Sequence, residues 1–479
     1  MNSVAVTRTA ARLKPTIGLG FWMERVLEEC NSASVEFAAE PVHDLRVAMR
    51  RCRSMADGLM TIDPDKSWKA MKKAGKPLFQ ALGELRDAQV MEEVVQSLAP
   101  ANDPVVVSVL SYVRLREQDL KAKALAALED FDRKAWRSWS RELPRRASRI
   151  RRGSAVFKHL ALERWTEARE LQRQAFRNRS QAGLHRLRIG LKRFRYTVEN
   201  FLPELHDAWI ADLKSLQDML GEVHDFDVLW AKIVELHAFP DDDARERWRV
   251  IVNDARNKRI EKYRERMLGN QSLWSVWRAE LPQGKQVRAA GLERLRIWAS
   301  LLDPNVQHSR HVARLALRLF DGLVMCKLRQ TPADENARDV LHAAALMHAA
   351  GGGRKKAFKL ISELQPPLGW SAEELTMAGV VARYHRGALP QSRHKQFSAL
   401  GIDQRKTGLH LAAVLRLACA FDADCSGSIQ DVQVRDCGRF LVIHARGYSA
   451  RSALAEGVAC SRHLLELVYG RPVMVRAWR

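Results

Sequence analysis

The sequence predicts a mainly α-helical protein, in which two tandem four-helix bundles precede a helical domain with a small α/β end. Apolar residues recur at three- and four-residue spacing through most of the 479 residues, as they do on amphipathic helices. Two short phrases each occur twice in the first 230 residues, which indicates an internal duplication. After Cys425 the pattern changes to short runs of β-branched and apolar residues, which is typical of strands.

Proline and glycine residues punctuate the first part of the chain and set the bounds of eight expected helices. These span roughly residues 19–38, 42–60, 66–98 and 104–133 in the first repeat, and 159–178, 184–201, 205–238 and 242–268 in the second. Short connections favour antiparallel neighbours, hence two four-helix bundles joined by a basic connector at 145–152. Residues 290–425 are expected to be mostly helical, and the end of the chain to form a strand, a helix at 453–468 and a second strand.

The duplicated phrases carry basic residues at identical offsets. VHDLRVAMRRCR begins at Val42 and LHRLRIGLKRFR begins at Leu184. LGELRDAQV, from Leu82, and LGEVHDFDV, from Leu220, follow the two copies at similar distances. A solvated helix face does not require the same cations at the same spacing, so the repetition favours an anion-binding site.

Each basic phrase forms a cationic stripe when it is placed on a helix, where successive residues are about 100° apart. The stripes consist of His43, Arg46, Arg50 and Arg53 in the first copy and His185, Arg188, Lys192 and Arg195 in the second. The opposite faces are apolar, with Leu45, Met49, Cys52, Ala56 and Leu59 in the first copy and Leu187, Leu191, Phe194, Val198 and Phe201 in the second. We interpret Asp87 and Asp225, in the following phrases, as partners that orient the arginines.

The composition favours a polyanionic partner, because the formal net charge is +23 and the isoelectric point is about 10.1. Nucleic acid, polyphosphate and an anionic membrane surface all satisfy this condition. The seven cysteines include no C-x-x-C pair, which indicates reduced thiols and a cytoplasmic location. The sequence has no export signal and no uninterrupted apolar run long enough to span a membrane, so no membrane partner is expected.

The paired phrases resemble those of the CHAD family, the conserved-histidine α-helical domains. The resemblance covers about residues 14–283, with repeats at about 14–140 and 155–283. It implies binding of inorganic polyphosphate through a basic surface where the two bundles meet, and a link to polyphosphate granules.

Carried onto this sequence residue by residue, the resemblance implies anion contacts at His43, Arg46, Arg50, Arg51 and Arg53, and at His185, Arg188, Lys192, Arg193 and Arg195. Lys76 and Lys214 stand at equivalent points of the repeat, six residues before an LG pair, and are additional expected contacts. For His43 and His185, a ligand contact and a structural role are weighted equally.

Residues 290–479 resemble the HD-type helical domain at the end of the exopolyphosphatase and guanosine pentaphosphate phosphohydrolase family. The matching phrases are HSRHVARLALRLFDGL from His308, LHAAALMHAAGG from Leu341, VARYHRGALP from Val381 and HLAAVLRLACAFDAD from His410. A catalytic HD site needs a His-Asp pair and a later Asp, but this sequence has His348-Ala349 and Cys419 there. His311, His348 and His385 are therefore expected to be packing residues and not metal ligands.

Together these observations predict a non-enzymatic polyphosphate-binding protein with no catalytic residue, metal or cofactor. The C-terminal domain is expected to be a second binding or targeting module, or an element that forms a homodimer. Two rival functions stay open, namely a nucleic-acid-binding protein and a polyphosphate or nucleotide phosphohydrolase with an atypical HD site. The protein is expected in the cytoplasm, either free or on polyphosphate granules.

Overall fold

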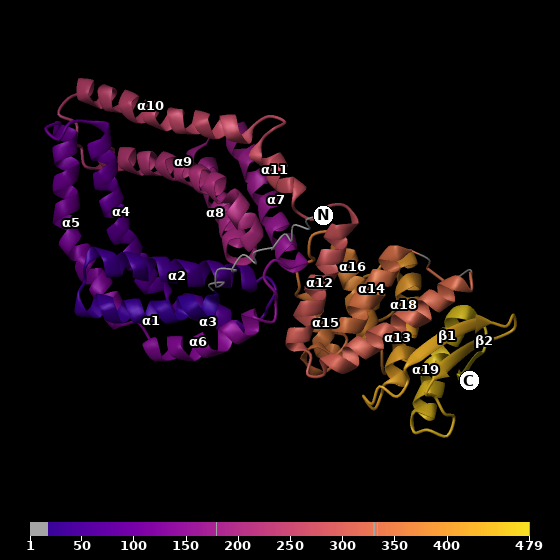
Figure 1. The fold of residues 1–479 in the computed structure, drawn as a ribbon. Coiled ribbons are helices and arrows are strands. Elements are labelled where there is room, and N and C mark those ends of the chain that lie inside the picture. Colours follow the sequence, from indigo (N-terminus) through magenta and orange to yellow (C-terminus); the bar gives the residue numbers. More distant parts are fainter. Residues whose placement is uncertain (1–17, 179, 329–330, 333, 479) are drawn as a thin grey trace, which may run out of the picture. The chain divides into compact units, whose positions relative to one another are not determined.

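The computed structural model describes residues 18–178, 180–328, 331–332 and 334–478, and it divides into two compact units at Leu281 and Pro282. The described part contains nineteen α-helices and one small three-stranded sheet (Figure 1), which confirms the predicted mainly helical class. The division falls just before the predicted end of the first domain, 14–283, and ahead of the second, 290–479, and the exact bounds of both stay predictions. Residues 14–17 of the first domain lie outside the described residues.

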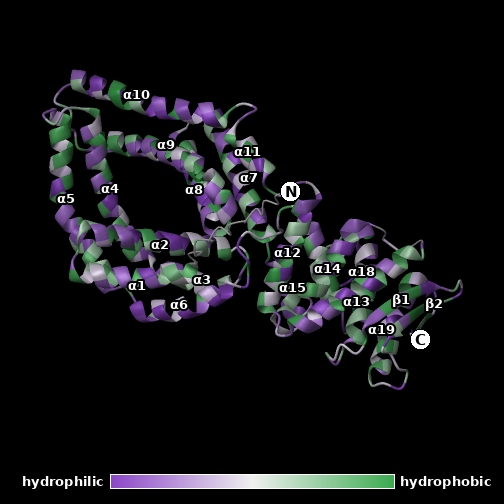
Figure 2. Ribbon diagram, in the orientation of Figure 1, coloured by the Kyte–Doolittle hydropathy of each residue, from purple (hydrophilic) through white to green (hydrophobic). Residues whose placement is uncertain are grey.

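The first unit contains helices α1 to α11. They are α1 (Leu19–Val35), α2 (Ala39–Leu59), α3 (Lys66–Ala74), α4 (Lys76–Leu98), α5 (Pro104–Glu129), α6 (Arg133–Ala147), α7 (Ala155–Asn178), α8 (Gln181–Phe201), α9 (Pro203–Glu235), α10 (Asp242–Met267) and α11 (Leu273–Ala279). None of the described helices is both long and apolar enough to cross a membrane. The 26-residue α10, for example, is hydrophilic over most of its length (Figure 2).

The long helices of this unit pack in pairs: α1 with α2, α4 with α5, α7 with α8 and α9 with α10. Figure 1 shows these pairs as the sides of a ring of helices. The two repeats do not close separately as the predicted bundles, because α4, α5, α9 and α10 share one hydrophobic core that includes Val109, Phe226 and Trp248. Apolar faces of both repeats are thereby buried against each other.

Asp103 reinforces this joint core. Its carboxylate caps α5 by accepting a hydrogen bond from the backbone N–H of Val105 at 2.9 Å, and it also accepts one from the indole N–H of Trp248 at 3.2 Å. A side chain at the start of a helix in the first repeat thus satisfies a buried donor of the second repeat. The contact joins residues 145 positions apart, which helical periodicity alone does not predict.

Two boundaries in the first repeat differ from the predicted ones. The expected helix at 66–98 is divided at Gly75 into α3 and α4, with Pro77 in the first turn of α4, where a missing N–H costs little. Most of the expected connection after residue 133 is helical as well. There α6 buries Trp136 and Leu143 and tolerates Pro144 close to its end.

The helices that carry the duplicated basic phrases, α2 and α8, contact each other near their C-terminal ends. Arg51 forms an ion pair of 2.5 Å with the buried carboxylate of Glu199, and Asn200 donates a hydrogen bond of 3.0 Å to the hydroxyl of Ser54. A Cβ atom at Gly58 would lie only 2.5 Å from the ring of Phe201, so the backbones approach closely there. These contacts fix the two basic stripes relative to each other.

The second unit contains helices α12 to α19 and strands β1 to β3. They are α12 (Lys285–Leu302), α13 (Val306–Met325), α14 (Glu335–Met347), α15 (Arg354–Ser362), α16 (Ala372–Arg383), α17 (Lys395–Ser398), α18 (Ile402–Phe421), β1 (Asp431–Asp436), β2 (Leu441–Arg446), α19 (Leu454–Tyr469) and β3 (Val473–Ala477). Strand β2 pairs antiparallel with β1 and parallel with β3, and α19 connects β2 to β3. The predicted strand, helix and strand are confirmed, and β1 is an additional strand.

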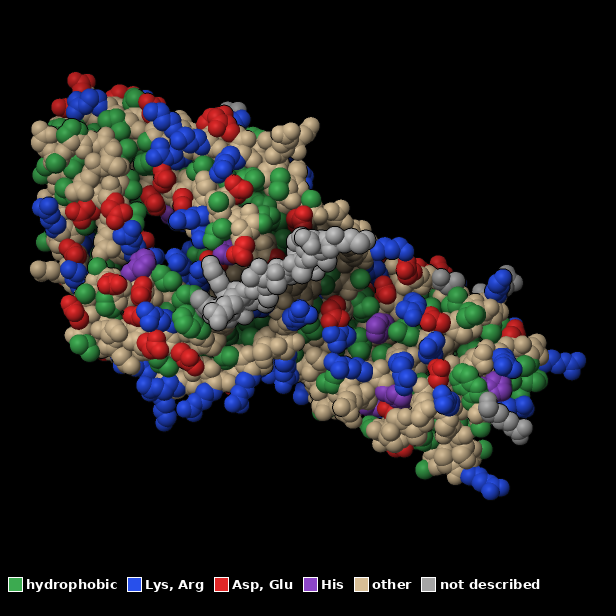
Figure 3. Space-filling view, viewed as in Figure 1, with side chains coloured by type: hydrophobic (Ala, Val, Ile, Leu, Met, Phe, Trp, Pro, Cys, Tyr) green, Lys and Arg blue, Asp and Glu red, His purple; other side chains and the backbone are tan. Residues whose placement is uncertain are grey.

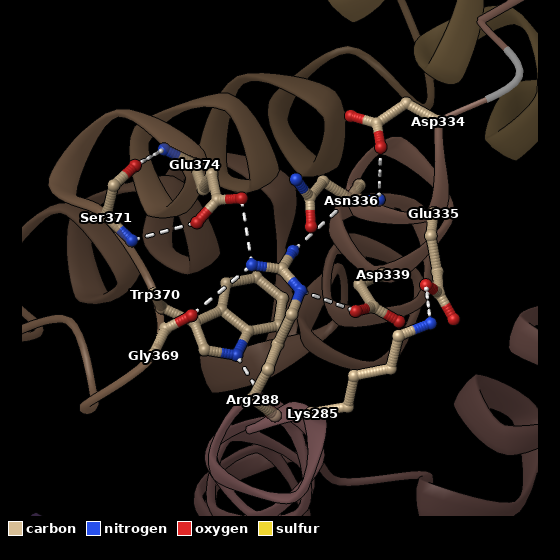
Figure 4. A network of polar contacts seen from close by, with 10 residues as sticks. All are labelled: Lys285, Arg288, Asp334, Glu335, Asn336, Asp339, Gly369, Trp370, Ser371 and Glu374. Carbon is tan, nitrogen blue, oxygen red and sulfur yellow. Dashed lines mark hydrogen bonds and ion pairs between the residues drawn. The ribbon is translucent and has the colours of Figure 1, made fainter. Parts of the chain in front are cut away.

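Arg288 ties three parts of this unit together (Figure 4). Its guanidinium donates to Asp339 on α14 at 2.6 Å and to Glu374 on α16 at 2.9 Å. It also lies over the ring of Trp370, 4.6 Å from the centroid, and the Trp370 indole donates to the Arg288 carbonyl at 3.2 Å. The contacts of the Arg288 guanidinium therefore stabilise the fold of this unit.

Candidate anion-binding site

The two basic stripes face a common opening in the first unit. Figure 3 shows this opening, with Lys, Arg, Asp, Glu and His side chains at its rim. The predicted apolar faces of α2 and α8 are buried as expected: Leu45, Met49, Cys52, Ala56, Leu59, Leu187, Leu191, Phe194, Val198 and Phe201 all lie in the core. Burial of these faces turns the cationic faces toward the opening.

Four cations converge at this place: Arg46 and Arg50 from α2 and Arg188 and Lys192 from α8. We call them the cation cluster. All four are half-buried, and they are close enough to act on one another electrostatically. Burial, together with the charges of the three arginines of the cluster, lowers the pKa of Lys192 to about 8, although the carboxylate of Asp87 acts in the opposite direction.

Carboxylates act on the cation cluster electrostatically, but none of the described ones forms a direct ion pair with it. Within the described part of the chain, none of its four members makes a hydrogen bond or an ion pair through its side chain. The Nε atoms of Arg46 and Arg50 are buried without a hydrogen-bond partner. Buried polar groups are normally hydrogen-bonded, and cations that repel one another cost folding free energy, so this arrangement is suited to a bound anion.

Two carboxylates lie near the cation cluster, but they do not pair with it. Burial raises the pKa of Asp225 to about 6, and the carboxylates of Asp87 and Glu222 act in the same direction, whereas Arg188 opposes them. Among the described residues, neither Asp87 nor Asp225 makes an ion pair or a side-chain hydrogen bond. Asp87 and Asp225 therefore act on Arg46 and Arg188 electrostatically and without a direct hydrogen bond, and their expected role in orienting the arginines stays a prediction.

The histidines of the basic phrases lie at the edge of the cation cluster. His43 is exposed and, together with Arg46, Arg86 and Gln89, lines a pocket of about 650 Å³. In the second repeat the Nδ1 atoms of His185 and His224 are 3.4 Å apart, within hydrogen-bond distance.

Arg86 and His224 occupy equivalent positions in the two LG phrases, and sequence reasoning missed both. Each lies immediately before the aspartates that were singled out, so the duplication itself was the available signal. Burial lowers the pKa of His224 to about 4, and Arg188 and His185 contribute to the decrease. This imidazole is therefore neutral at physiological pH.

Four of the other expected contacts serve the fold. Arg51 and Arg195 approach the carboxylate of Glu199, at 2.5 and 4.0 Å. Arg53 donates to the carbonyl of Lys72 at the end of α3, at 2.8 Å, and lies over the ring of Phe79. Arg193 forms an exposed ion pair of 3.0 Å with Glu167 on α7. These side chains hold neighbouring helices instead of joining the cation cluster.

Lys76 and Lys214 are exposed on α4 and α9. Each precedes the Arg86 or His224 position by ten residues, or about 15 Å along an α-helix. Their expected contacts with the anion stay predictions. Their side chains make no ion pair with described residues.

The geometry defines a class of protein: a helical, internally repeated domain that presents convergent cations. Residues 26–233 match the family model of the CHAD domain, and residues 287–440 match that of the Ppx/GppA phosphatase, domain III. The chain thus has one segment similar to each of these two domains, in this order.

One similar solved structure is the CHAD domain from the plant Ricinus communis. It is 22% identical in sequence, and the similarity covers 55% of this chain and 90% of that chain with a TM-score of 0.36. No curated protein matches the chain.

Proposed function

We propose that this protein binds inorganic polyphosphate at the cation cluster, without hydrolysing it. The observation that supports this proposal is the convergence of Arg46, Arg50, Arg188 and Lys192, none of which forms an ion pair with a described carboxylate. A linear polyphosphate offers a continuous row of negatively charged oxygens, so that several charge-assisted hydrogen bonds form on one ligand. The similarity to a CHAD domain and to a Ppx/GppA domain agrees with a polyphosphate-related role.

A thin, flexible phosphate chain suits this site better than nucleic acid does. The cation cluster provides guanidinium and ammonium groups from two helices, and one aromatic ring lies beside it, that of Tyr196, whose centroid is 5.8 Å from Nζ of Lys192, whereas a row of stacked bases needs several rings. Phosphates in nucleic acid are separated by sugars and bases, whereas those of polyphosphate follow one another directly. Consecutive phosphates of one chain can therefore reach all four cations at once.

The direct test is a binding titration of the full chain with long-chain polyphosphate, DNA, RNA and ATP at equal concentrations of phosphate units. We expect polyphosphate to bind at least about tenfold more tightly than the others, a difference of about 1.4 kcal/mol. Phosphate release, measured in the same samples with Mg²⁺ present, should not exceed that of a heat-denatured control. Equal affinity for DNA, or sustained phosphate release, would contradict the proposal.

Polyphosphate binding should weaken as the pH rises above about 8. The pKa of Lys192 is lowered to about 8 in the unliganded protein. A bound polyanion raises that pKa, so binding takes up a proton once the pH exceeds 8. Affinity is therefore greatest below pH 8 and falls above it by up to about tenfold per pH unit.

The control for this pH dependence is Lys192→Arg. Arginine stays protonated across the range, so this variant should give a nearly constant dissociation constant between about pH 7 and about pH 9. Titrations of both proteins with the same polyphosphate preparation remove any contribution from ionisation of the ligand. Parallel pH profiles for the two proteins would show that Lys192 does not take up the proton.

A further inference from the structure

Three side chains that can ligate metal ions meet inside the second unit. His348 follows α14, His385 follows α16, and Cys419 lies on α18. One ligand atom from each of them lies within 4.8 Å of the others, and the residues are only 2, 5 and 1% exposed. No other group of three such residues occurs in the described part of the chain.

The two histidines are held in the tautomer that a metal requires. Nδ1 of His348 lies 2.7 Å from the carbonyl oxygen of Ala345, and Nδ1 of His385 lies 2.6 Å from that of Ala382. A carbonyl oxygen only accepts hydrogen bonds, so Nδ1 carries the proton in both rings and Nε2 holds the lone pair.

The backbone hydrogen bonds engage only Nδ1 of each ring, and within the described structure neither Nε2 of His348 and His385 nor the sulfur of Cys419 makes a hydrogen bond. The ring of His308 packs against that of His348, with centroids 5.4 Å apart, and Asp422 holds Nδ1 of His308 at 2.7 Å. Carboxylates that fix imidazoles in this way commonly surround protein metal sites.

We propose that His348, His385 and Cys419 form a binding site for a borderline divalent transition metal, best matched by Zn²⁺. Two imidazole nitrogens and a thiolate suit Zn²⁺, whereas Mg²⁺ and Ca²⁺ prefer oxygen ligands. On binding, the metal displaces the thiol proton of Cys419, which is released to solvent, and water completes the coordination. The thiol stands where the HD pattern has a carboxylate, so the exchange replaces a hard donor with a soft one.

Cobalt substitution tests this site directly. The reduced full-length protein is loaded with Co²⁺, and we expect about one metal ion per chain and a thiolate-to-cobalt charge-transfer band in the near ultraviolet. The band should disappear in Cys419→Ser and persist in Cys52→Ser, a matched control that removes a buried thiol from the first unit. His348→Gln should weaken Zn²⁺ binding at least roughly 100-fold in competition with a chelator.

The spectrum of the Co²⁺-loaded wild-type protein tests the proposed site even if Cys419→Ser fails to fold. A Co²⁺-loaded protein without the charge-transfer band would refute the thiolate ligand, and a protein that binds no metal would refute the site. A band that is unchanged in folded Cys419→Ser would assign the metal to another cysteine and equally overturn the proposal. Polyphosphate binding by the first unit is read out separately, so neither result bears on the other proposal.

Discussion

Replacing Arg50 and Lys192 together with glutamate should abolish polyphosphate binding by the folded protein. Each change removes a charge-assisted hydrogen bond, worth about 1.5 to 3 kcal/mol, and places a negative charge beside the phosphates. The combined loss should exceed roughly 1,000-fold in the dissociation constant. Helical content and thermal unfolding should change little, because both side chains lack ion pairs in the described structure and the substitutions relieve repulsion within the cation cluster.

The matched control reverses two charges elsewhere on the same unit. Arg137 and Arg141 are exposed on α6, where Figure 3 shows a row of basic side chains along the edge of the molecule. Arg137→Glu with Arg141→Glu changes the net charge by the same amount and should weaken binding only through long-range attraction, by about tenfold or less. Equal losses in the two double variants would mean that polyphosphate adsorbs to positive charge in general.

The duplicated stripes were predictable because they depend on local geometry. A helix places residues three and four apart on one face, so Arg46 and Arg50, and Arg188 and Lys192, had to line up once the apolar faces were buried. The same rule assigned Arg195 to the site, and the family resemblance added Arg51. Neither revealed that Glu199 competes for them, because Glu199 reaches Arg51 only through the contact of α2 with α8.

The packing of the two repeats was less accessible from the sequence. Short connections and apolar stripes are equally consistent with two separate bundles and with helix pairs that pack against the other repeat. The choice is made by contacts such as Trp248 with Asp103, which join distant segments. Strand β1 was not predicted, because only two of its residues, Val432 and Val434, are buried and the apolar pattern is therefore short.

The convergence of His348, His385 and Cys419 shows the same limit in the second unit. The sequence displayed the loss of two carboxylates and therefore argued against an HD metal site. It could not show that the remaining nitrogens and the new thiol face one point, because these residues belong to segments brought together by α14, α16 and α18. The sequence shows that the type of donor atom has changed, but it does not show how the donors are arranged in space.

Neutralising either stripe alone should weaken every high-affinity site and not only half of them, if both stripes hold the same segment of polyphosphate. Arg46→Ala with Arg50→Ala, and separately Arg188→Ala with Lys192→Ala, should each weaken long-chain polyphosphate roughly 100-fold, since two charge-assisted hydrogen bonds are lost in each case. The loss of binding free energy in the variant with all four changes should be clearly smaller than the sum of the losses in the two pair variants. Once one stripe is neutralised, the chain is no longer held against the other stripe, so the second pair of changes removes less. Calorimetric titration of the two pair variants and of the four-residue variant measures this coupling, with tripolyphosphate as a short ligand that should lose far less. Two independent patches would behave differently: each pair variant would keep half of the binding sites at their original affinity, and that result would overturn a site shared by the two repeats.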